Sequence, residues 1–130
     1  MKNFLLLLAL LAVVGLQSCK TTIRYGKEWE LVKLNDETIP AGVRIMIVFD
    51  EANTRYSGTA SCNDYNGLFK LDGGKLKMAQ PVSTKKMCPD MSWENKYLPT
   101  LTKIDTWNIV DEQLQLSRSE ERRVGKECLR

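Results

Sequence analysis

The chain has 130 residues, 43% of them hydrophobic, with 19 Lys and Arg, 16 Asp and Glu, four Cys and no His. A chain of this length forms one compact domain, and a second full domain does not fit. The absence of His excludes Ser-His-Asp and Cys-His catalysis, His-ligated metal sites and a His-based pH switch. We therefore expect a protein that is not an enzyme and has no metal or cofactor.

The first 18 residues have the pattern of a secretory signal. Lys2 precedes an uncharged apolar run over residues 4–16. This run is too short to cross the roughly 30 Å hydrocarbon layer as a permanent helix, which disfavours a transmembrane anchor. The next residues, Leu16-Gln17-Ser18-Cys19, resemble the lipobox of bacterial lipoproteins, in which the chain is cut before the Cys and the Cys is acylated.

The lipobox resemblance implies that Cys19 is lipidated and holds the protein on a membrane. Several acyl chains bind a bilayer far more firmly than one myristoyl chain. Lys20 follows, rather than Asp, which by analogy with sorting in bacteria with two membranes favours the outer membrane, facing the periplasm. Residues 19–26 are then the lipidated Cys and a short tether. The alternative is a secreted protein with Cys19 as a free thiol.

Residues 118–130 have a different composition from the rest of the chain. Arg118 to Cys128 carries seven charges in eleven residues, which is typical of a solvated tail. This stretch also resembles the conceptual translation of a common DNA sequencing adapter. We therefore expect the natural sequence to depart from this one near Leu116 or Ser117, and Cys128 to have no role. Resequencing the parent locus tests this expectation.

The segment from Cys19 to Ser117 has no net charge. It holds 13 basic residues (19 less Lys2 and five in the tail) and 13 acidic ones (16 less three in the tail). Its largest basic cluster is Lys85-Lys86. Binding to nucleic acid needs several phosphate contacts, so we expect no nucleic-acid partner.

The hydrophobic pattern from residue 28 onward predicts mainly strands. Residues 28–34 alternate imperfectly, residues 43–49 are nearly all apolar, and residues 54–60 form a third strand. The apolar composition of 43–49 predicts that this strand is covered on both faces. Residues 68–71 and 76–78 flank Asp72-Gly73-Gly74, which is typical of a hairpin.

One helix is predicted after Pro81, where apolar residues recur at helical spacing from Trp93 to Ile104. Asp90 or Ser92 is available as its N-cap, and Pro99 is expected to kink or break it near Leu98.

Two more short strands, at 107–109 and 114–116, flank Asp111-Glu112. Together these elements predict an α+β domain over residues 27–117, an antiparallel β-meander or partly open barrel of about seven strands with one helix. The final strand is expected to be missing, which would leave an unpaired sheet edge and favour self-association.

An ordered set of motifs resembles the META domain, the family that includes the bacterial heat-shock protein HslJ. Its most specific part is Gly58-Thr-Ala-Ser-Cys62-Asn63-Asp-Tyr-Asn66-Gly67 followed by Thr84-Lys-Lys-Met-Cys88. Further matches are Trp29-Glu-Leu31, Ile47-Val-Phe49-Asp50, a helix containing Glu94 and Leu101, and Leu114-Gln-Leu116.

The resemblance covers residues 29–116 and implies a small exported or lipid-anchored bacterial protein linked to stress tolerance, without established catalytic activity. It marks Asn63, Gly67 and Thr84 as family motif residues. The family continues with one more strand after the segment matching 114–116, where this chain has the charged tail.

Cys62 and Cys88 are the two cysteines left to pair in an exported domain once Cys19 carries lipid and Cys128 is set aside. A disulfide is the main interpretation. A redox-active or metal-binding thiol pair is the alternative, but two thiolates without His make a poor zinc site.

The polar stretch from Asn63 to Gly67 superficially resembles a calcium loop but lacks the bidentate Glu that such a loop requires. We expect instead that Asn63 and Asn66 bond backbone groups in a tight connection where Gly67 takes positive φ. Thr84-Lys85-Lys86 is interpreted as a solvated loop rather than an anion contact.

The three tryptophans, Trp29, Trp93 and Trp107, are expected to pack in the core or between helix and sheet rather than form a stacking platform. The function that follows is a non-enzymatic, lipid-anchored envelope protein acting in stress tolerance or envelope maintenance through protein contacts. The alternative is a binding module for a small apolar or envelope-derived ligand.

Overall fold

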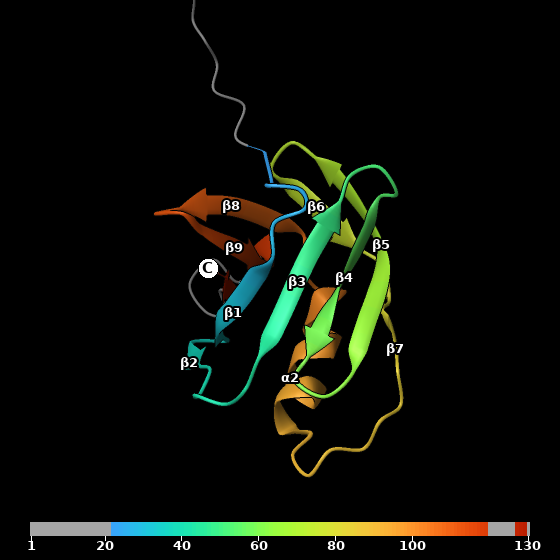
Figure 1. Cartoon of the computed structure of the whole chain (residues 1–130). Coiled ribbons are helices and arrows are strands. Elements are labelled where there is room, and N and C mark those ends of the chain that lie inside the picture. Colours follow the sequence, from blue (N-terminus) through green and yellow to red (C-terminus); the bar gives the residue numbers. More distant parts are fainter. Residues whose placement is uncertain (1–21, 120–126, 130) are drawn as a thin grey trace, which may run out of the picture.

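The structure, a computed structural model, describes residues 22–119 and 127–129 (Figure 1). The predicted signal at 1–18 and the lipidation site Cys19 lie outside the described residues. The described chain forms a 10-stranded sheet and one helix. The elements are β1 (Trp29–Leu34), β2 (Glu37–Thr38), β3 (Ile45–Asp50), β4 (Arg55–Ala60), β5 (Asp64–Asp72), β6 (Lys75–Met78), β7 (Val82–Ser83), α2 (Ser92–Leu101), β8 (Thr106–Val110), β9 (Gln113–Ser117) and β10 (Glu127–Leu129).

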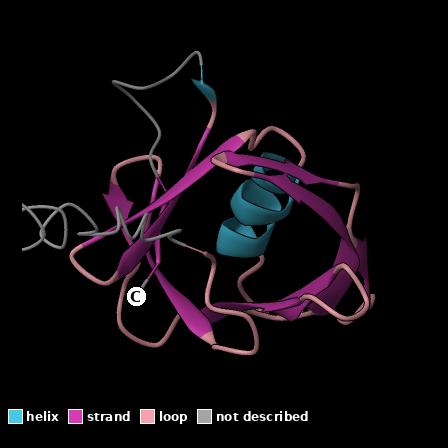
Figure 2. Ribbon diagram, turned by 90° about the horizontal axis from the view of Figure 1, so that it is seen from above, coloured by secondary structure: helices cyan, strands magenta, loops and turns pink. Residues whose placement is uncertain are grey.

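The sheet curls around helix α2 (Figure 2). Its strand order is β10-β9-β8-β6-β5-β4-β3-β1-β2, with β7 on β5, and β10 at one end also pairs with β1, the strand before the other end. The pairings are antiparallel. The contact between β6 and β8 is short, with the single register pair Lys75↔Thr106. The α+β, partly open barrel fold predicted from the sequence is confirmed, with more strands than the expected seven.

The missing final strand is the exception to this agreement. Residues 127–129 form β10, which pairs with residues 114–116 of β9 and with Leu31 and Lys33 of β1. The sheet edge beside β9 that we expected to be unpaired is therefore paired over these residues. The adapter-like origin of residues 118–130 stays a prediction.

The core lies between the curled sheet and α2. In β3 the side chains of Ile45, Ile47 and Phe49 are buried, whereas Met46 and Val48 are only half-buried on the outer face. The prediction that this strand is covered on both faces is wrong, because its outer face is open. The three tryptophans belong to the core as expected: Trp29 and Trp107 are buried, and Trp93 packs against the core.

Two glycines leave room for tyrosine rings that cross neighbouring strands. Tyr65 of β5 reaches over Gly58 of β4 and donates a 2.8 Å hydrogen bond to the carbonyl oxygen of Met46. In the same way, a Cβ on Gly67 would lie 2.6 Å from Cζ of Tyr56. Gly67 is part of β5 and does not have positive φ, so that prediction is wrong. The residue is glycine at this position because a side chain would collide with the Tyr56 ring.

Helix α2 begins differently from the prediction and passes through Pro99. Its N-cap is Met91, while Asp90 Oδ1 accepts a 2.9 Å hydrogen bond from the backbone N–H of Ser92. This bond satisfies one of the amide groups that a helix leaves open at its start. Pro99 lies within the helix, which continues to Leu101, so the expected break near Leu98 does not occur.

The buried Tyr56 hydroxyl predicts a loss of stability at high pH. It donates a hydrogen bond to the carbonyl oxygen of Ala79, and burial raises its pKa from 10.0 to about 12. Above pH 10 the unfolded chain releases this proton while the folded chain keeps it, so stability is complete below pH 10 and falls as pH rises toward 12. We expect a loss on the order of 2 kcal/mol.

Urea unfolding of the wild type and of Tyr56→Phe across this pH range measures the effect. Below pH 10 the variant should have a lower free energy of unfolding than the wild type, because it lacks the hydrogen bond to Ala79. Above pH 10 its free energy of unfolding should fall less steeply as the pH rises. Parallel falls for both proteins would show that Tyr56 is not the titrating group.

Candidate functional site

Two of the predicted motif residues, Asn63 and Thr84, meet the two cysteines at the end of the barrel where β4 turns into β5. Cys62 and Asn63 lie in the short connection between these strands, Thr84 directly follows β7, and Cys88 lies in the loop that leads to α2. Glu94 reaches the same place from the first turn of α2. We call Cys62, Asn63, Thr84, Cys88 and Glu94 the motif cluster.

Asn63 is the centre of the motif cluster and is 2% exposed. Its Oδ1 accepts hydrogen bonds from Thr84 Oγ1 at 2.8 Å and from the Lys86 backbone N–H at 2.6 Å. Its Nδ2 donates to the Lys86 carbonyl at 3.1 Å and to Glu94 Oε1 at 2.6 Å. One amide side chain therefore ties the loop after β7 and the helix to the β4–β5 connection.

Glu94 is a buried acid, 4% exposed, whose carboxylate accepts three hydrogen bonds. Besides the bond to Asn63 Nδ2, Oε2 accepts from the backbone N–H of Asn63 at 2.7 Å and of Cys62 at 3.3 Å. Glu94 is part of the META-like motif, but the sequence alone predicts no role for it. Glu94 lies three residues before Tyr97 and seven before Leu101, which places it on the buried face of the helix. This spacing would have predicted that Glu94 is buried.

The disulfide prediction is confirmed, because Cys62 and Cys88 are bonded to each other. The bond joins the β4–β5 connection to the loop before α2, 26 residues later. The same two segments are thus linked covalently and through Asn63.

Asn66 and Gly67 do not join the motif cluster. Both lie within β5, and Asn66 Oδ1 accepts a 2.7 Å bond from Arg55 Nη1 rather than from a backbone group, so that prediction is wrong. The tight connection is shorter than expected and contains Ser61, which has φ of 79°. In residues 22–119 and 127–129, no group of three or more His, Cys, Asp or Glu is placed to hold a metal ion.

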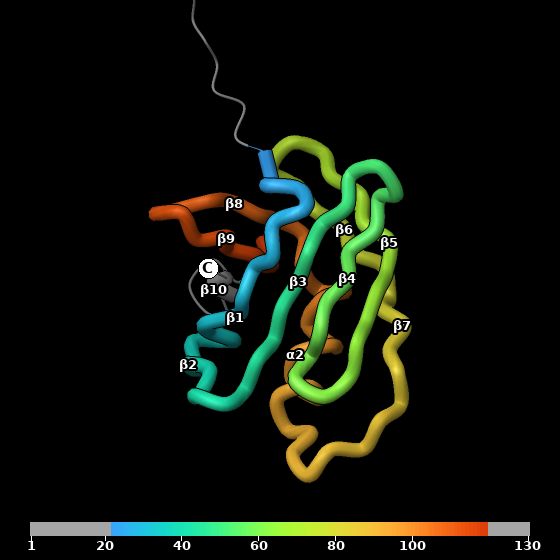
Figure 3. Tube along the Cα trace, in the orientation of Figure 1, coloured from blue at the N-terminus to red at the C-terminus, as the bar shows by residue number. Residues whose placement is uncertain are grey.

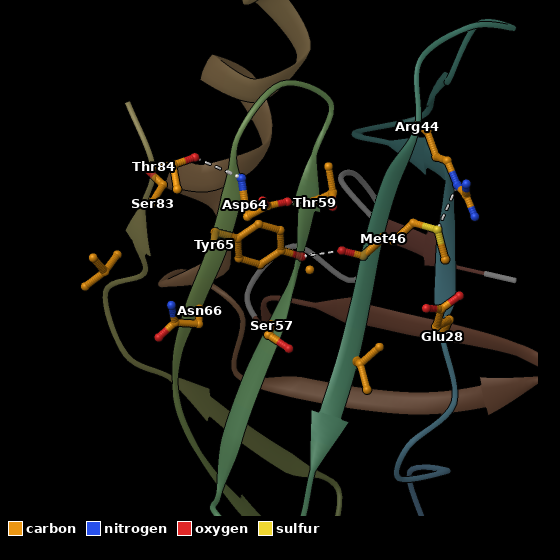
Figure 4. A pocket seen from close by; sticks show the side chains of 13 residues that line it. Glu28, Arg44, Met46, Ser57, Thr59, Asp64, Tyr65, Asn66, Ser83 and Thr84 are labelled. Carbon is orange, nitrogen blue, oxygen red and sulfur yellow. Dashed lines mark hydrogen bonds between the residues drawn. The ribbon is translucent and has the colours of Figure 1, made fainter. Parts of the chain in front are cut away.

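A groove of about 790 Å³ lies beside the motif cluster on the outer face of the sheet (Figure 4). Its floor contains the short side chains of Ser57 and Thr59 on β4, between Met46 and Val48 on one side and Asn66 on the other. Thr59 Oγ1 donates to Asp64 Oδ1 at 3.0 Å. The residues that line it are Glu28, Arg44, Met46, Val48, Ser57, Gly58, Thr59, Asp64, Tyr65, Asn66, Val82, Ser83 and Thr84.

The family model of the META domain matches residues 21–127. The chain belongs to the META domain family. The motif cluster and the two tyrosine-facing glycines are therefore features of a META domain. A comparison with curated proteins finds no match.

Solved structures share the fold of this META domain. An NMR structure of a protein from Burkholderia xenovorans is 24% identical, with a TM-score of 0.65 and 81% of each chain covered. A second NMR structure is 20% identical, with a TM-score of 0.60, and covers 79% of this chain and 86% of its own. The crystal structure of a DUF4847 family protein from Bacteroides vulgatus ATCC 8482 is 13% identical, with a TM-score of 0.60 and coverage of 82% and 93%.

The described part of the META domain chain contains no helix long and apolar enough to cross a membrane.

Truncating Glu94 tests whether the motif cluster stabilises the META domain. Glu94→Ala leaves the N–H groups of Asn63 and Cys62 without their acceptor, and we expect the free energy of unfolding to fall by about 2 to 3 kcal/mol. Urea unfolding with the disulfide intact measures the change. Glu37→Ala is the matched control, because Glu37 is exposed and only pairs with Lys96 at 3.0 Å. The control should cost less than about 1 kcal/mol, and equal losses in both variants would contradict the assignment.

Proposed function

We propose that this chain is a lipid-anchored envelope protein whose META domain acts without catalysis, in stress tolerance or envelope maintenance, through contacts with other envelope proteins. The observation that carries the proposal is the order of the sequence: an apolar signal run ends in Leu16-Gln17-Ser18-Cys19, and the META domain match begins at residue 21. The domain would therefore stay close to the membrane that carries the lipid.

The chemistry of the motif cluster supports a non-catalytic role. The Asn63 amide and the Glu94 carboxylate are buried and bonded to each other and to backbone groups. The two thiols form a disulfide and so cannot act as nucleophiles. Hydrogen bonds of this kind hold segments of the chain together. The Glu94 carboxylate, the acid of the cluster, is bonded to amide groups and does not activate a nucleophile.

The groove on the outer sheet face favours the second candidate function, binding of a small apolar or envelope-derived ligand. Met46 and Val48 are apolar but only half-buried, and Val82 on the far side of the groove is 70% exposed. Apolar side chains next to hydroxyl and amide groups are typical of ligand sites. The inside of the barrel, by contrast, is occupied by core side chains.

Affinity capture of the full-length protein from membranes tests the two candidates, with identification of both proteins and small molecules. A protein partner supports the first, and a bound lipid or small molecule without any protein supports the second. Ser57→Arg places a long side chain in the groove and should prevent capture of a ligand that binds there. Asn108→Arg on β8, away from the groove, is the matched control and should leave capture unchanged. Mass spectrometry of the amino-terminal peptide tests the anchor, and an unmodified Cys19 would contradict it.

A further inference from the structure

The segment that follows Cys19 joins the barrel at one defined end. Ile23 is 1% exposed and packs in the core, and the N–H of Gly26 donates a 2.9 Å bond to the carbonyl oxygen of Phe49, near the end of β3. The Tyr25 ring stacks on Phe69 of β5, with ring centroids 6.5 Å apart. These contacts fix the attachment point at the end of the barrel where β3 ends, the same end at which β5 turns into β6 (Figures 1 and 3).

The distance between Cys19 and this attachment point is limited by covalent geometry. Cys19 and Ile23 are separated by four residue steps, which span at most about 14 Å when fully extended. Ile23 itself is held in the core. A lipid on Cys19 would thus keep this end of the barrel within about 14 Å of the bilayer, and the Debye length at physiological ionic strength is about 8 Å. Because 14 Å is an upper limit, this end of the barrel can approach to within about one Debye length of the membrane surface.

Three lysines project from the outer face of this hairpin. Lys70 pairs with Lys77 across the two strands, and Lys75 lies next to the tip. All three are exposed, and none forms a salt bridge with another described residue. In β6 the exposed Lys75 and Lys77 alternate with the buried Leu76 and Met78, which places the two lysines on the outer face. Lys70 lies directly opposite Lys77 on β5 and is on the same face.

Residues 70–77 of the hairpin contain the three lysines and one acidic residue. Asp72 lies opposite Lys75 at the hairpin tip. Asp50, the last residue of β3, accepts bonds from the N–H of Ala52 and from Asn53 Nδ2. The Asn53 bond holds the pKa of its carboxyl below the usual range, so Asp50 keeps its negative charge, on β3 and not on the hairpin. Glu51 is beside it, and exposed Arg24 in the tether adds a further positive charge.

We propose that the outer face of the β5–β6 hairpin contacts anionic lipid headgroups. The proposal rests on the lipid anchor of the proposed function. With Cys19 in the bilayer, Lys70, Lys75 and Lys77 face the membrane surface. The motif cluster, at the opposite end of the barrel, then points away from it. The hairpin sets the orientation of the domain, because anionic lipids attract lysines near their surface and one lipid anchor alone leaves the domain free to turn.

Amine labelling of the lipidated protein in vesicles tests the orientation. The protein is purified from membranes and reconstituted into vesicles of phosphatidylcholine, with or without phosphatidylglycerol. Labelling rates of individual lysines are read by mass spectrometry. With phosphatidylglycerol present, we expect Lys70, Lys75 and Lys77 to react about five-fold more slowly. Lys85 and Lys86, in the loop at the far end, are the internal controls and should be unchanged. High salt should remove the difference.

Two results would overturn the inference, and they can be told apart. Protein that carries acyl chains and floats with the vesicles, but whose hairpin lysines react equally in both lipid mixtures, would contradict the orientation and leave the anchor standing. Protein with an unmodified Cys19 that does not float would contradict the anchor itself, and with it the orientation.

Discussion

Replacing Gly58 by Ala is expected to lower the free energy of unfolding by about 3 kcal/mol. A Cβ at this position would overlap the carbonyl oxygen of Met46 and lie 2.9 Å from the Tyr65 hydroxyl. That carbonyl is part of the β3 backbone and also accepts the hydrogen bond from Tyr65. Strand, ring and hydrogen bond would all have to shift together, and none of them is the free end of a flexible side chain.

Gly74→Ala is the control for the Gly58 variant, because nothing lies within 4 Å of a Cβ at position 74. Urea unfolding of both variants gives the comparison. A small loss for Gly74→Ala beside a large one for Gly58→Ala fits the close approach. A Gly58→Ala protein as stable as the wild type would show that β3 and β4 are not this close in solution.

Removing the disulfide is expected to cost about 3 to 4 kcal/mol. The bond between Cys62 and Cys88 closes a loop with a sequence separation of 26, and opening it restores the freedom of that loop in the unfolded chain. A domain of this size has a total stability of about 5 to 15 kcal/mol, so the loss is a large share.

The double variant Cys62→Ser and Cys88→Ser can be measured against wild-type protein by urea unfolding, and against wild type treated with reductant. Both comparisons should give losses of similar size. Mass spectrometry should find the two cysteines linked in protein purified without reductant. Free thiols there, or an unchanged unfolding midpoint in the double variant, would refute a stabilising bond.

Hydrophobic alternation was enough to predict most of the sheet. The strand expected at 28–34 is β1 at Trp29–Leu34, and the hairpin around Asp72 and Gly73 joins β5 to β6. Two-residue strands such as β2 and β7 are too short to give a pattern. The pairing of β10 depends on residues far apart in the sequence, which local patterns do not report.

Turn chemistry misled the prediction at Asn66 and Gly67. Asn followed by Gly is typical of a turn, but here both residues extend β5, and Gly67 meets the Tyr56 ring from the neighbouring strand. Glycine is needed at position 67 because a side chain would collide with the Tyr56 ring, and not because the backbone has positive φ. A single sequence does not distinguish these two uses of glycine.

The motif cluster could be predicted in part. The pairing of Cys62 and Cys88 followed from the count of available cysteines, and the bond of Asn63 to a backbone group was also expected. The position of Glu94 beside Asn63 was not, because it depends on how α2 packs against the β4–β5 connection. Helical spacing identifies the buried face but not the partner of a polar residue on it.

The central claim is that the motif cluster of this META domain forms one structural unit. A double-mutant cycle of Asn63→Ala and Glu94→Ala, measured by urea unfolding with the disulfide intact, tests it most directly, since the two side chains are hydrogen-bonded at 2.6 Å. We predict that the two single losses do not add and that the coupling free energy is about 1 kcal/mol or more. Losses that add to within about 0.3 kcal/mol would contradict the claim.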